Sequence, residues 1–369
     1  MYRSLDQTNN GVLVTGATGF VGSYLVKLLL ERGNRVYALA RDQKGLAPQE
    51  RIFRILNFWD RRVLKNKRKN LTIIKGDLTQ ENLSLSRRNL NILKHNITEV
   101  FHCGAATRFE ENIKILKNVN ISGCQNLFSL CLEWKKGGRC NKVNHLSTAY
   151  ICGNFTGNFK ETHLDVGQKF YTYYEESKFL AEKIVEEYRK SGLAIDIFRP
   201  PAIVGETKSG KALTFNQSLY QFLHVLSLGI FDLYPVDIKQ KFNMVCVDEL
   251  CCAIILINQG TKNKNCNYHT FPSNSLSLRK IIKFYAHFLK LNDPTFISLE
   301  KFYKSNFSTA QRKLIEHNLL FLSRKVNFDS RFTNSYLKEK GFKFSAFSKN
   351  LLISLVQYPL KTGFIKIKR

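Results

Sequence analysis

Residues 12–22, Val12-Leu13-Val14-Thr15-Gly16-Ala17-Thr18-Gly19-Phe20-Val21-Gly22, decide the fold of this chain. They begin as an apolar run typical of a buried strand and continue into a turn with three glycines. Residues 23–30 then have the length and the apolar spacing of a helix. The order of strand, glycine turn and helix predicts the first unit of a doubly wound α/β sheet.

Each glycine of the turn has its own physical reason. Gly16 lets the chain turn sharply at the strand end, Gly19 lets backbone N–H groups approach a pyrophosphate, and Gly22 lets the helix pack closely. The helix start adds unpaired N–H groups and the positive end of the helix dipole. We therefore predict a dinucleotide site here, with a purely structural turn as the alternative. The predicted contacts are Gly16, Thr18, Gly19, Phe20, Val21 and Gly22.

The residues at the end of the next predicted strand, 35–41, indicate which of two cofactors is bound. An acidic residue there binds the ribose 2′-hydroxyl of NAD, whereas an arginine suits the 2′-phosphate of NADP. Ala40 and Arg41 stand at this strand end. We therefore favour NADPH over NADH. Two alternatives stay open: Asp42 follows directly, and Arg41 is compatible with a role as an exposed loop charge.

Strand and helix patterns alternate along the following residues. Strands are predicted at 71–75, 99–102, 142–146 and 194–198, and helices at 49–66, 112–134 and 173–183. This alternation predicts an α/β fold, a Rossmann-type doubly wound parallel sheet with right-handed crossovers.

Ligands of such sheets bind at the carboxyl ends of the strands. There, Asp77 is expected to accept a hydrogen bond from adenine or to cap the next turn. The small residues at 103–107 are expected to let a cofactor lie flat against the backbone. His102 is expected to be packed at its strand end rather than catalytic.

The pattern changes past Gly205. A return strand and a helix start are predicted at 242–250, with Asp248 as the helix cap, and from about residue 270 the chain is helical, basic and aromatic. We predict a cofactor-binding domain at 1–205, completed by about 243–268. Residues 206–242 and 269–369 are predicted to form a smaller, mostly helical C-terminal lobe that binds the substrate at the ligand edge of the sheet.

A second group of residues carries chemistry. Thr148, or its neighbour Ser147, closes the fifth predicted strand, and Tyr174 and Lys178 stand one turn apart on one face of a helix. An ammonium beside a phenol favours the phenolate and lowers its pKa from about 10. With a nicotinamide, this set supports hydride transfer to a carbonyl: Tyr174 donates the proton, Thr148 steadies the oxyanion and Lys178 also holds the ribose.

Composition limits the possible partners. The 369 residues carry 57 Lys and Arg against 29 Asp and Glu, a formal net charge of +28. The charges are spread widely without a recognisable nucleic-acid module, so nucleic acid is not an expected partner. The nine cysteines form no CxxC pair and show no ligand spacing with histidine, which predicts reduced thiols and no metal site.

The sequence also bears on location. The first residues lack an apolar signal core and no apolar run reaches spanning length, so we expect a cytoplasmic protein. The basic tail at 361–369 is an expected peripheral contact for acidic surfaces.

Taken together, the motifs resemble those of the extended short-chain dehydrogenases/reductases. More narrowly, they are similar to the thioester-reductase branch, which includes fatty acyl-CoA reductases and the terminal reductase domains of carboxylic acid reductases and nonribosomal peptide synthetases. The resemblance covers roughly residues 11–256. The segments that carry it are TGATGFVG (15–22), ALAR (38–41), GDLT (76–79), HCGAAT (102–107), NVNISGCQNL (118–127), HLSTAYICG (145–153), YEESKFLAEK (174–183) and RPPAIVGE (199–206).

This resemblance implies Thr148, Tyr174 and Lys178 as catalytic residues and NADPH as the cofactor. It also implies reduction of an acyl thioester, carried by coenzyme A or an acidic carrier protein, to an aldehyde or onward to an alcohol. The basic charge fits such anionic partners, because opposite charge raises encounter rates. Besides the glycine turn, the predicted cofactor contacts are Arg41, Asp77, Leu78, Ala105, Tyr174, Lys178, Pro200 and Ile203.

Two other functions fit the same fold. One is a nucleotide-sugar epimerase or dehydratase, or a hydroxysteroid-type dehydrogenase, which only the substrate lobe distinguishes from a thioester reductase. The other is a non-catalytic regulator that binds the cofactor, against which the intact set of Thr148, Tyr174 and Lys178 argues. The sequence specifies neither the acyl group nor the oligomeric state.

Overall fold

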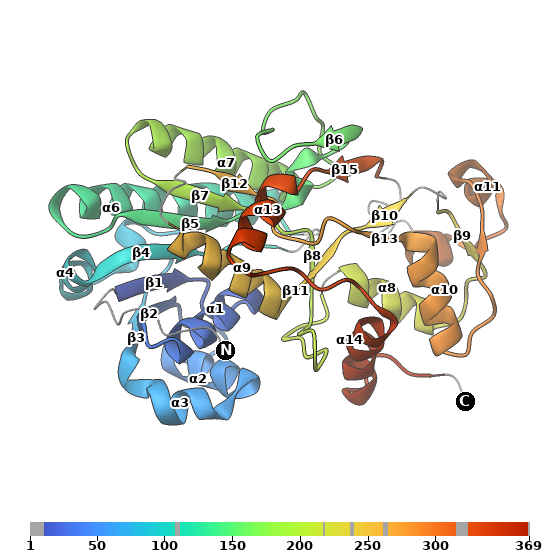
Figure 1. Ribbon diagram of the computed structural model, residues 1–369, viewed down its shortest axis with the longest axis horizontal. Coiled ribbons are helices and arrows are strands. Elements are labelled where there is room, and N and C mark those ends of the chain that lie inside the picture. The colour runs from blue at the N-terminus through green and yellow to red at the C-terminus, as the bar shows by residue number, and fades with distance from the viewer. Residues whose placement is uncertain are drawn as a thin grey trace. The chain divides into compact units, whose positions relative to one another are not determined.

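A computed structural model describes residues 11–107, 111–216, 218–236, 240–260, 265–314 and 324–367 (Figure 1). The chain start, for which no signal segment is expected, and the last two residues of the basic tail lie outside this range. The chain divides into two units, of which the first comprises Met1–Gly153, Thr172–Arg199 and Cys251–His269 and the second Asn154–Tyr171, Pro200–Leu250 and Thr270–Arg369. Residues 154–171 and 200–205 thus fall in the second unit, whereas the predicted boundary after 205 puts them in the first.

A seven-stranded sheet forms the centre of the first unit, in the spatial order β12-β7-β5-β4-β1-β2-β3. Every neighbouring pair is parallel, which confirms the predicted doubly wound fold. The order reverses between β1 and β4, the place where such sheets bind ligands. The strands are β1 (Gly11–Thr15), β2 (Arg35–Ala40), β3 (Leu71–Lys75), β4 (Ile97–His102), β5 (Lys142–Leu146), β7 (Ile195–Phe198) and β12 (Asn267–Tyr268).

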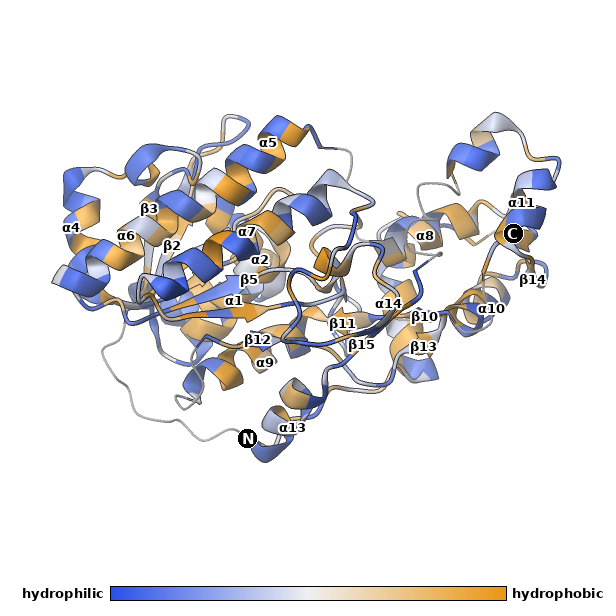
Figure 2. Cartoon of the chain, turned by 90° about the horizontal axis from the view of Figure 1, so that it is seen from above, coloured by the Kyte–Doolittle hydropathy of each residue, from blue (hydrophilic) through white to orange (hydrophobic). Residues whose placement is uncertain are grey.

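Helices cover both faces of this sheet. Figure 2 shows α6 and α7 on one face of the strands and α9 on the other. The Cys251 thiol of α9 donates to the Val21 carbonyl of α1 (3.7 Å). The helices are α1 (Phe20–Glu31), α2 (Pro48–Trp59), α3 (Arg61–Lys67), α4 (Arg87–Asn96), α5 (Ile113–Lys117), α6 (Gly123–Gly137), α7 (Tyr173–Lys190) and α9 (Val247–Gln259), with 3-10 turns at Arg68–Asn70, Glu81–Ser84 and Ala149–Cys152.

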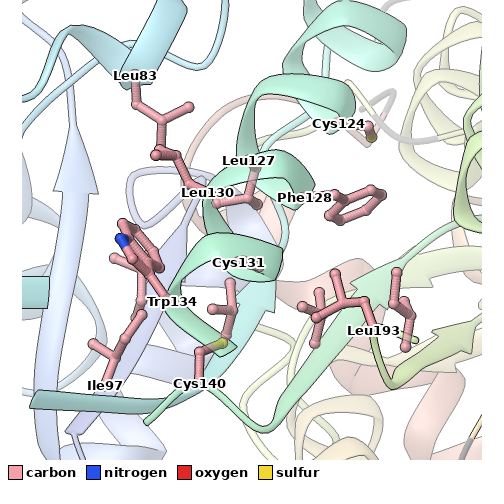
Figure 3. Packing of buried hydrophobic residues seen from close by; sticks show 14 of the residues in the cluster. Leu83, Ile97, Cys124, Leu127, Phe128, Leu130, Cys131, Trp134, Cys140 and Leu193 are labelled. Atoms are coloured by element: carbon pink, nitrogen blue, oxygen red, sulfur yellow. The ribbon is translucent and has the colours of Figure 1, made fainter. Parts of the chain in front are cut away.

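A hydrophobic cluster packs one face of the sheet against α4, α6 and α7. On α6, buried side chains recur at helical spacing, and Figure 3 shows them as Cys124, Leu127, Phe128, Cys131 and Trp134. Such an apolar stripe fixes a helix on a sheet. The packing therefore holds in place the strands whose ends carry the site.

Two helices are interrupted where the sequence predicts continuous ones. The segment at 49–66 is two helices, because Asp60 is extended (φ −156°, ψ 115°) and its side chain accepts from the Arg62 N–H to start α3. The segment at 112–134 contains a π-helical turn at Asn118–Ser122, between α5 and α6. Turns of this kind occur frequently at functional sites.

The second unit contains short strand pairs and helices. Its two-stranded pairs are β6 (Gly157–Phe159) with β15 (Val326–Phe328), β8 (Ala202–Val204) with β11 (Met244–Cys246), β9 (Leu233–Tyr234) with β14 (Thr295–Phe296), and β10 (Lys241–Phe242) with β13 (Leu276–Ser277). Its helices are α8 (Ser218–Ser227), α10 (Leu278–Phe288), α11 (Leu299–Lys304), α13 (Arg331–Glu339) and α14 (Lys349–Lys361). Across the described ranges, no helix is long and apolar enough to cross a bilayer.

The expected cap at Asp248 is wrong. The helix α9 already begins at Val247, which places Asp248 inside its first turn. Its carboxylate instead accepts hydrogen bonds from the Thr207 N–H (3.1 Å) and hydroxyl (2.6 Å). Asp248 therefore ties the start of α9 to the loop after β8.

Candidate active site

The glycine turn runs from the end of β1 to the start of α1 and passes against the end of β4. Gly16 has φ +65°, and a Cβ on it would lie 2.5 Å from the Cys103 carbonyl carbon and the Gly104 nitrogen. The Gly19 N–H donates to the Gly16 carbonyl (2.8 Å). A Cβ on Gly22 would overlap that same carbonyl oxygen. Gly16 and Gly22 are therefore required sterically, Gly22 because α1 approaches the turn itself.

The helix α1 starts directly at this turn. Gly19 is its N-cap and contributes no side-chain hydrogen bond, so the helix start can present its N–H groups and its dipole to an anion. Thr18 is half-buried, and Val21 is buried. The Phe20 ring stacks on Trp59, with centroids 5.9 Å apart. Because the side chains of Phe20 and Val21 pack within the unit, their predicted cofactor contacts would come from the backbone.

A cavity of about 590 Å³ lies at the ends of β2 and β3, a volume in the range of small-molecule sites. Within it, the Arg41 guanidinium donates to Asp77 Oδ2 (3.3 Å). Asp77 Oδ1 accepts from the Thr79 N–H and hydroxyl (3.0 and 2.9 Å). Burial raises the pKa of Asp77, but the hydrogen bonds from Thr79 and Arg41 outweigh it and the pKa is lowered. Asp77 is thus ionised. It caps the following turn, which is one of the two roles expected for it, the other being a hydrogen bond from adenine.

Arg51, on α2, joins this site although the sequence did not single it out. Its guanidinium donates to the Thr18 hydroxyl (3.0 Å) and to the Arg41 carbonyl (2.5 Å). Asp42 forms an ion pair with Lys75. Arg51 thus contacts the glycine turn at Thr18 and is close enough to Arg41 for the two charges to interact. A pair of neighbouring guanidinium groups suits a phosphate. In the sequence, Arg51 is one of many basic residues on a polar helix face.

The floor of the site is formed by the loop after β4. Ala105 is half-buried there, and a Cβ on Gly104 would overlap the Leu78 side chain. Asn120, in the π-helical turn, accepts from the Ala106 N–H (2.8 Å) and donates to the Ala106 carbonyl (3.0 Å) and to Ser177 Oγ (2.9 Å). Asn120 therefore fixes this loop against α7, a role absent from the predicted set.

Thr148, Tyr174 and Lys178 come together at the end of β5. The Thr148 side chain is hydrogen-bonded to the Tyr174 phenol. Lys178 lies one turn after Tyr174 on α7, is 2% exposed, and its Nζ donates to the Leu146 carbonyl (2.8 Å). Ser147, the alternative hydroxyl, is buried beside them. The hydroxyl that contacts the phenol is therefore that of Thr148.

The protonation of this group differs from the expectation. Burial raises the pKa of Tyr174, and the opposing hydrogen bond with Thr148 does not reverse the shift. Burial also lowers the pKa of Lys178. Burial thus sets the direction of the Tyr174 pKa shift, and the phenol is protonated near neutral pH, as a proton donor must be.

The last two predicted cofactor contacts belong to the second unit. Pro200 is buried, two residues after the end of β7. Ile203 lies in β8, where its register partner is Val245. Their contact with the cofactor stays a prediction.

Comparison with known proteins places this chain in a family. The family model described as male sterility protein, an NAD(P)-binding family, matches residues 14–254. The chain is 28% identical over 272 residues to the nonribosomal peptide synthetase asaC of Aspergillus flavus, covering 71% of this chain and 26% of that protein. It is 33% identical over 202 residues to fatty acyl-CoA reductase 1 of Mus musculus, covering 53% of this chain and 36% of that protein. The chain thus spans about a third or less of the length of these relatives.

Solved structures share the fold. The terminal R domain of the myxalamid PKS-NRPS pathway superposes with a TM-score of 0.82 at 21% identity, covering 99% of this chain and 94% of that one. MoeE5 in complex with UDP-glucose and NAD reaches a TM-score of 0.66 at 19% identity, covering 96% of this chain and 99% of that one. On the family match, the chain belongs to the male sterility protein family of extended short-chain dehydrogenases/reductases.

Proposed function

We propose that this chain is an NADPH-dependent reductase that converts an acyl thioester to an aldehyde or an alcohol. The observation that carries the proposal is the contact of the Tyr174 phenol with the Thr148 side chain, with the buried Lys178 one turn further along α7. The proposal is supported by the similarity to a protein named fatty acyl-CoA reductase 1. Family membership favours it over the nucleotide-sugar and hydroxysteroid alternatives.

The residues divide the chemistry between them. A bound reduced nicotinamide cofactor would supply hydride to the thioester carbonyl carbon. The Tyr174 phenol donates its proton to the carbonyl oxygen, and the Thr148 hydroxyl donates a hydrogen bond to that oxygen as charge develops. The resulting hemithioacetal collapses to an aldehyde and a free thiol. A second cycle on the aldehyde would give the alcohol.

The proposed preference for NADPH rests on the residues at the ends of β2 and β3, the exposed end of the site. Arg51 donates to Thr18 of the glycine turn and to the Arg41 carbonyl, and the Arg41 side chain is 52% exposed. Their guanidinium groups are suited to hold a 2′-phosphate by paired hydrogen bonds. Asp42, the residue that would favour NADH, is already paired with Lys75.

The proposed substrates are thioesters of coenzyme A or of an acidic carrier protein. A net charge of +28 would attract both, because each is anionic. One solved structure of similar fold, with a TM-score of 0.81 at 19% identity, is a thiolation-reductase di-domain. We also propose a cytoplasmic location, on the basis of the nine free cysteines.

The test is to incubate the purified chain with NADPH and a panel of acyl-CoA and acyl-carrier thioesters. We expect loss of NADPH absorbance, with aldehyde or alcohol identified by mass spectrometry. Tyr174→Phe should abolish turnover, whereas Tyr173→Phe is the matched control, because Tyr173 is 55% exposed on the same helix. Turnover of a nucleotide sugar without any thioester reduction would overturn the proposal, and so would turnover that persists in Tyr174→Phe.

A further inference from the structure

Three buried donor side chains meet behind the active site. His102 ends β4, His145 lies in β5, and Cys124 is in the first turn of α6, where Figure 3 shows it near Phe128. Their exposed fractions are 1%, 0% and 1%. One ligand atom from each lies within 4.8 Å of the others. Three elements of the first unit thus bring two imidazoles and one thiol together, at sequence separations that no spacing rule would detect.

The hydrogen bonds of His102 resemble those of a metal ligand. Its Nδ1 lies 2.7 Å from Thr15 Oγ1, and its Nε2 lies 3.3 Å from Cys124 Sγ. Metal-binding histidines usually use their second ring nitrogen in this way, which fixes the tautomer and the ring orientation. The nitrogen that faces the thiol is therefore the one free to bind an ion.

His145 provides an independent observation. Among the described residues, neither of its ring nitrogens has a hydrogen-bond partner, although the side chain is fully buried. Leaving a buried polar group unpaired destabilises a fold. The His145 ring packs beside that of His102, with centroids 5.2 Å apart. A ligand between the two rings and the thiol would satisfy His145.

The charges at the cluster favour an ion of low charge. All three donors are buried, and the Lys178 ammonium, 2% exposed, is close enough to act on each of them. Ligation requires neutral imidazoles and a thiolate, so an ion must displace the Cys124 proton. A monovalent ion with one thiolate is neutral overall, so it is repelled less by the Lys178 ammonium than a dication would be.

We propose that His102, Cys124 and His145 bind one Cu(I) ion in a three-coordinate site. Binding forms one copper–sulfur and two copper–nitrogen bonds, and the Cys124 proton is released to solvent. Thiolate and imidazole are the donors that copper prefers, and two histidines with one cysteine form a known trigonal copper set. For metal–ligand bonds of about 2.0–2.3 Å, the donors must close by roughly 1 Å.

The test loads the purified full chain with Cu(I) from a weak chelator under anaerobic, reducing conditions, without any substrate. We expect one tightly held copper per chain, with X-ray absorption showing one sulfur and two nitrogen neighbours. Cys124→Ala should weaken binding at least 100-fold. Cys131→Ala, which removes another fully buried thiol of α6, should leave binding unchanged.

Each result decides the proposal. Copper surrounded by two or more sulfurs, no copper retained by the wild-type chain, or equal retention by Cys124→Ala and the wild type would each overturn it. Circular dichroism checks that the variants fold. If Cys124→Ala does not fold, His145→Gln replaces it, and unchanged Cu(I) affinity in that variant overturns the proposal in the same way. A failure here leaves the reductase proposal untouched, because no thioester or NADPH is present.

Discussion

Two places in the first unit hold interacting polar groups, and they differ in exposure to water. The exposed end is the cavity at the ends of β2 and β3, and the buried end is the group of residues at the end of β5. At the exposed end, Arg41 and Asp77 form an ion pair at 3.3 Å with side chains 52% and 27% exposed. At the buried end, Thr148 and Lys178 are 4% and 2% exposed. Water screens the first pair, so it contributes little energy, whereas the buried groups interact strongly. The exposed end is therefore suited to select a cofactor, and the buried end to perform chemistry.

The largest difference in stability is expected between a buried and an exposed ion pair. Arg199 and Glu182 are paired at 2.6 Å with both side chains fully buried. Glu182→Ala should lower the free energy of unfolding by about 3–5 kcal/mol, because it leaves an unpaired buried charge. Arg41→Ala removes the exposed pair but leaves the Asp77 cap in place, and it should lower the free energy of unfolding by less than about 1 kcal/mol, because that pair is partly exposed. Urea unfolding of both variants measures the difference, and equal losses would contradict a stronger interaction in the buried pair.

The next largest effect is expected at Thr148. Thr148→Val removes the hydroxyl that contacts Tyr174 and is proposed to steady the oxyanion, which should lower kcat about 100- to 1,000-fold. Thr148→Ser keeps the hydroxyl and should retain most of the activity. Steady-state kinetics with the best thioester measure both variants. A loss confined to KM in Thr148→Val would show that the hydroxyl acts in binding alone.

The buried histidines should make stability depend on pH. The pKa of His102 is about 3 in the folded chain, against about 6.5 in the unfolded chain. The unfolded chain therefore binds more protons between these values. The stability from a neutral His102 is complete above about pH 6.5 and is lost as the pH falls toward 3, by about 1.4 kcal/mol per pH unit. Unfolding at pH 6.5, 5.5 and 4.5 should show a slope shallower by that amount in His102→Gln, and an unchanged slope would contradict the neutral His102.

The smallest effect is expected at the exposed end. Arg41→Ala and Arg51→Ala should each raise the KM for NADPH about tenfold, equivalent to about 1.4 kcal/mol, and leave that for NADH nearly unchanged. The change in kcat should be small, because neither side chain contacts the reacting atoms. Cofactor titrations at two salt concentrations measure this, and the loss should shrink at higher salt. An equal change for both cofactors would remove the 2′-phosphate role.

Much of the fold could be predicted because local signals agree with the tertiary structure. The strand at 71–75 and that at 142–146 have the predicted bounds. Each is a short segment that ends at turn-forming residues, which are Gly76 and Asp77 in the first and Ser147 and Thr148 in the second. The break at Asp60 was missed because apolar residues continue at helical spacing on both sides of it. The π-helical turn at Asn118–Ser122 was missed because its residues do not depart from a helical pattern.

Some residues of the site could also be predicted from local sequence signals, and others could not. The Thr148, Tyr174 and Lys178 set could be proposed because a fixed i, i+4 spacing and a strand end define it. Arg51 and Asn120 could not, because their roles arise from contacts with Thr18 and Ala106 that only the folded chain creates. The direction of the Tyr174 pKa shift was missed for a related reason: charge proximity can be inferred from spacing, whereas burial cannot.

The short strand β12 has a consequence for synthesis of the chain. It pairs with β7 through Asn267↔Ile197 and Tyr268↔Phe198. About seventy residues, most of them in the second unit, must therefore leave the ribosome after β7 before its outer edge can be covered. During that interval β7 is an unpaired apolar edge strand, and such edges can pair with strands of other chains. Slowing translation while β7 has left the ribosome and β12 has not should thus increase aggregation of the nascent chain, whereas slowing it after β12 has emerged should not.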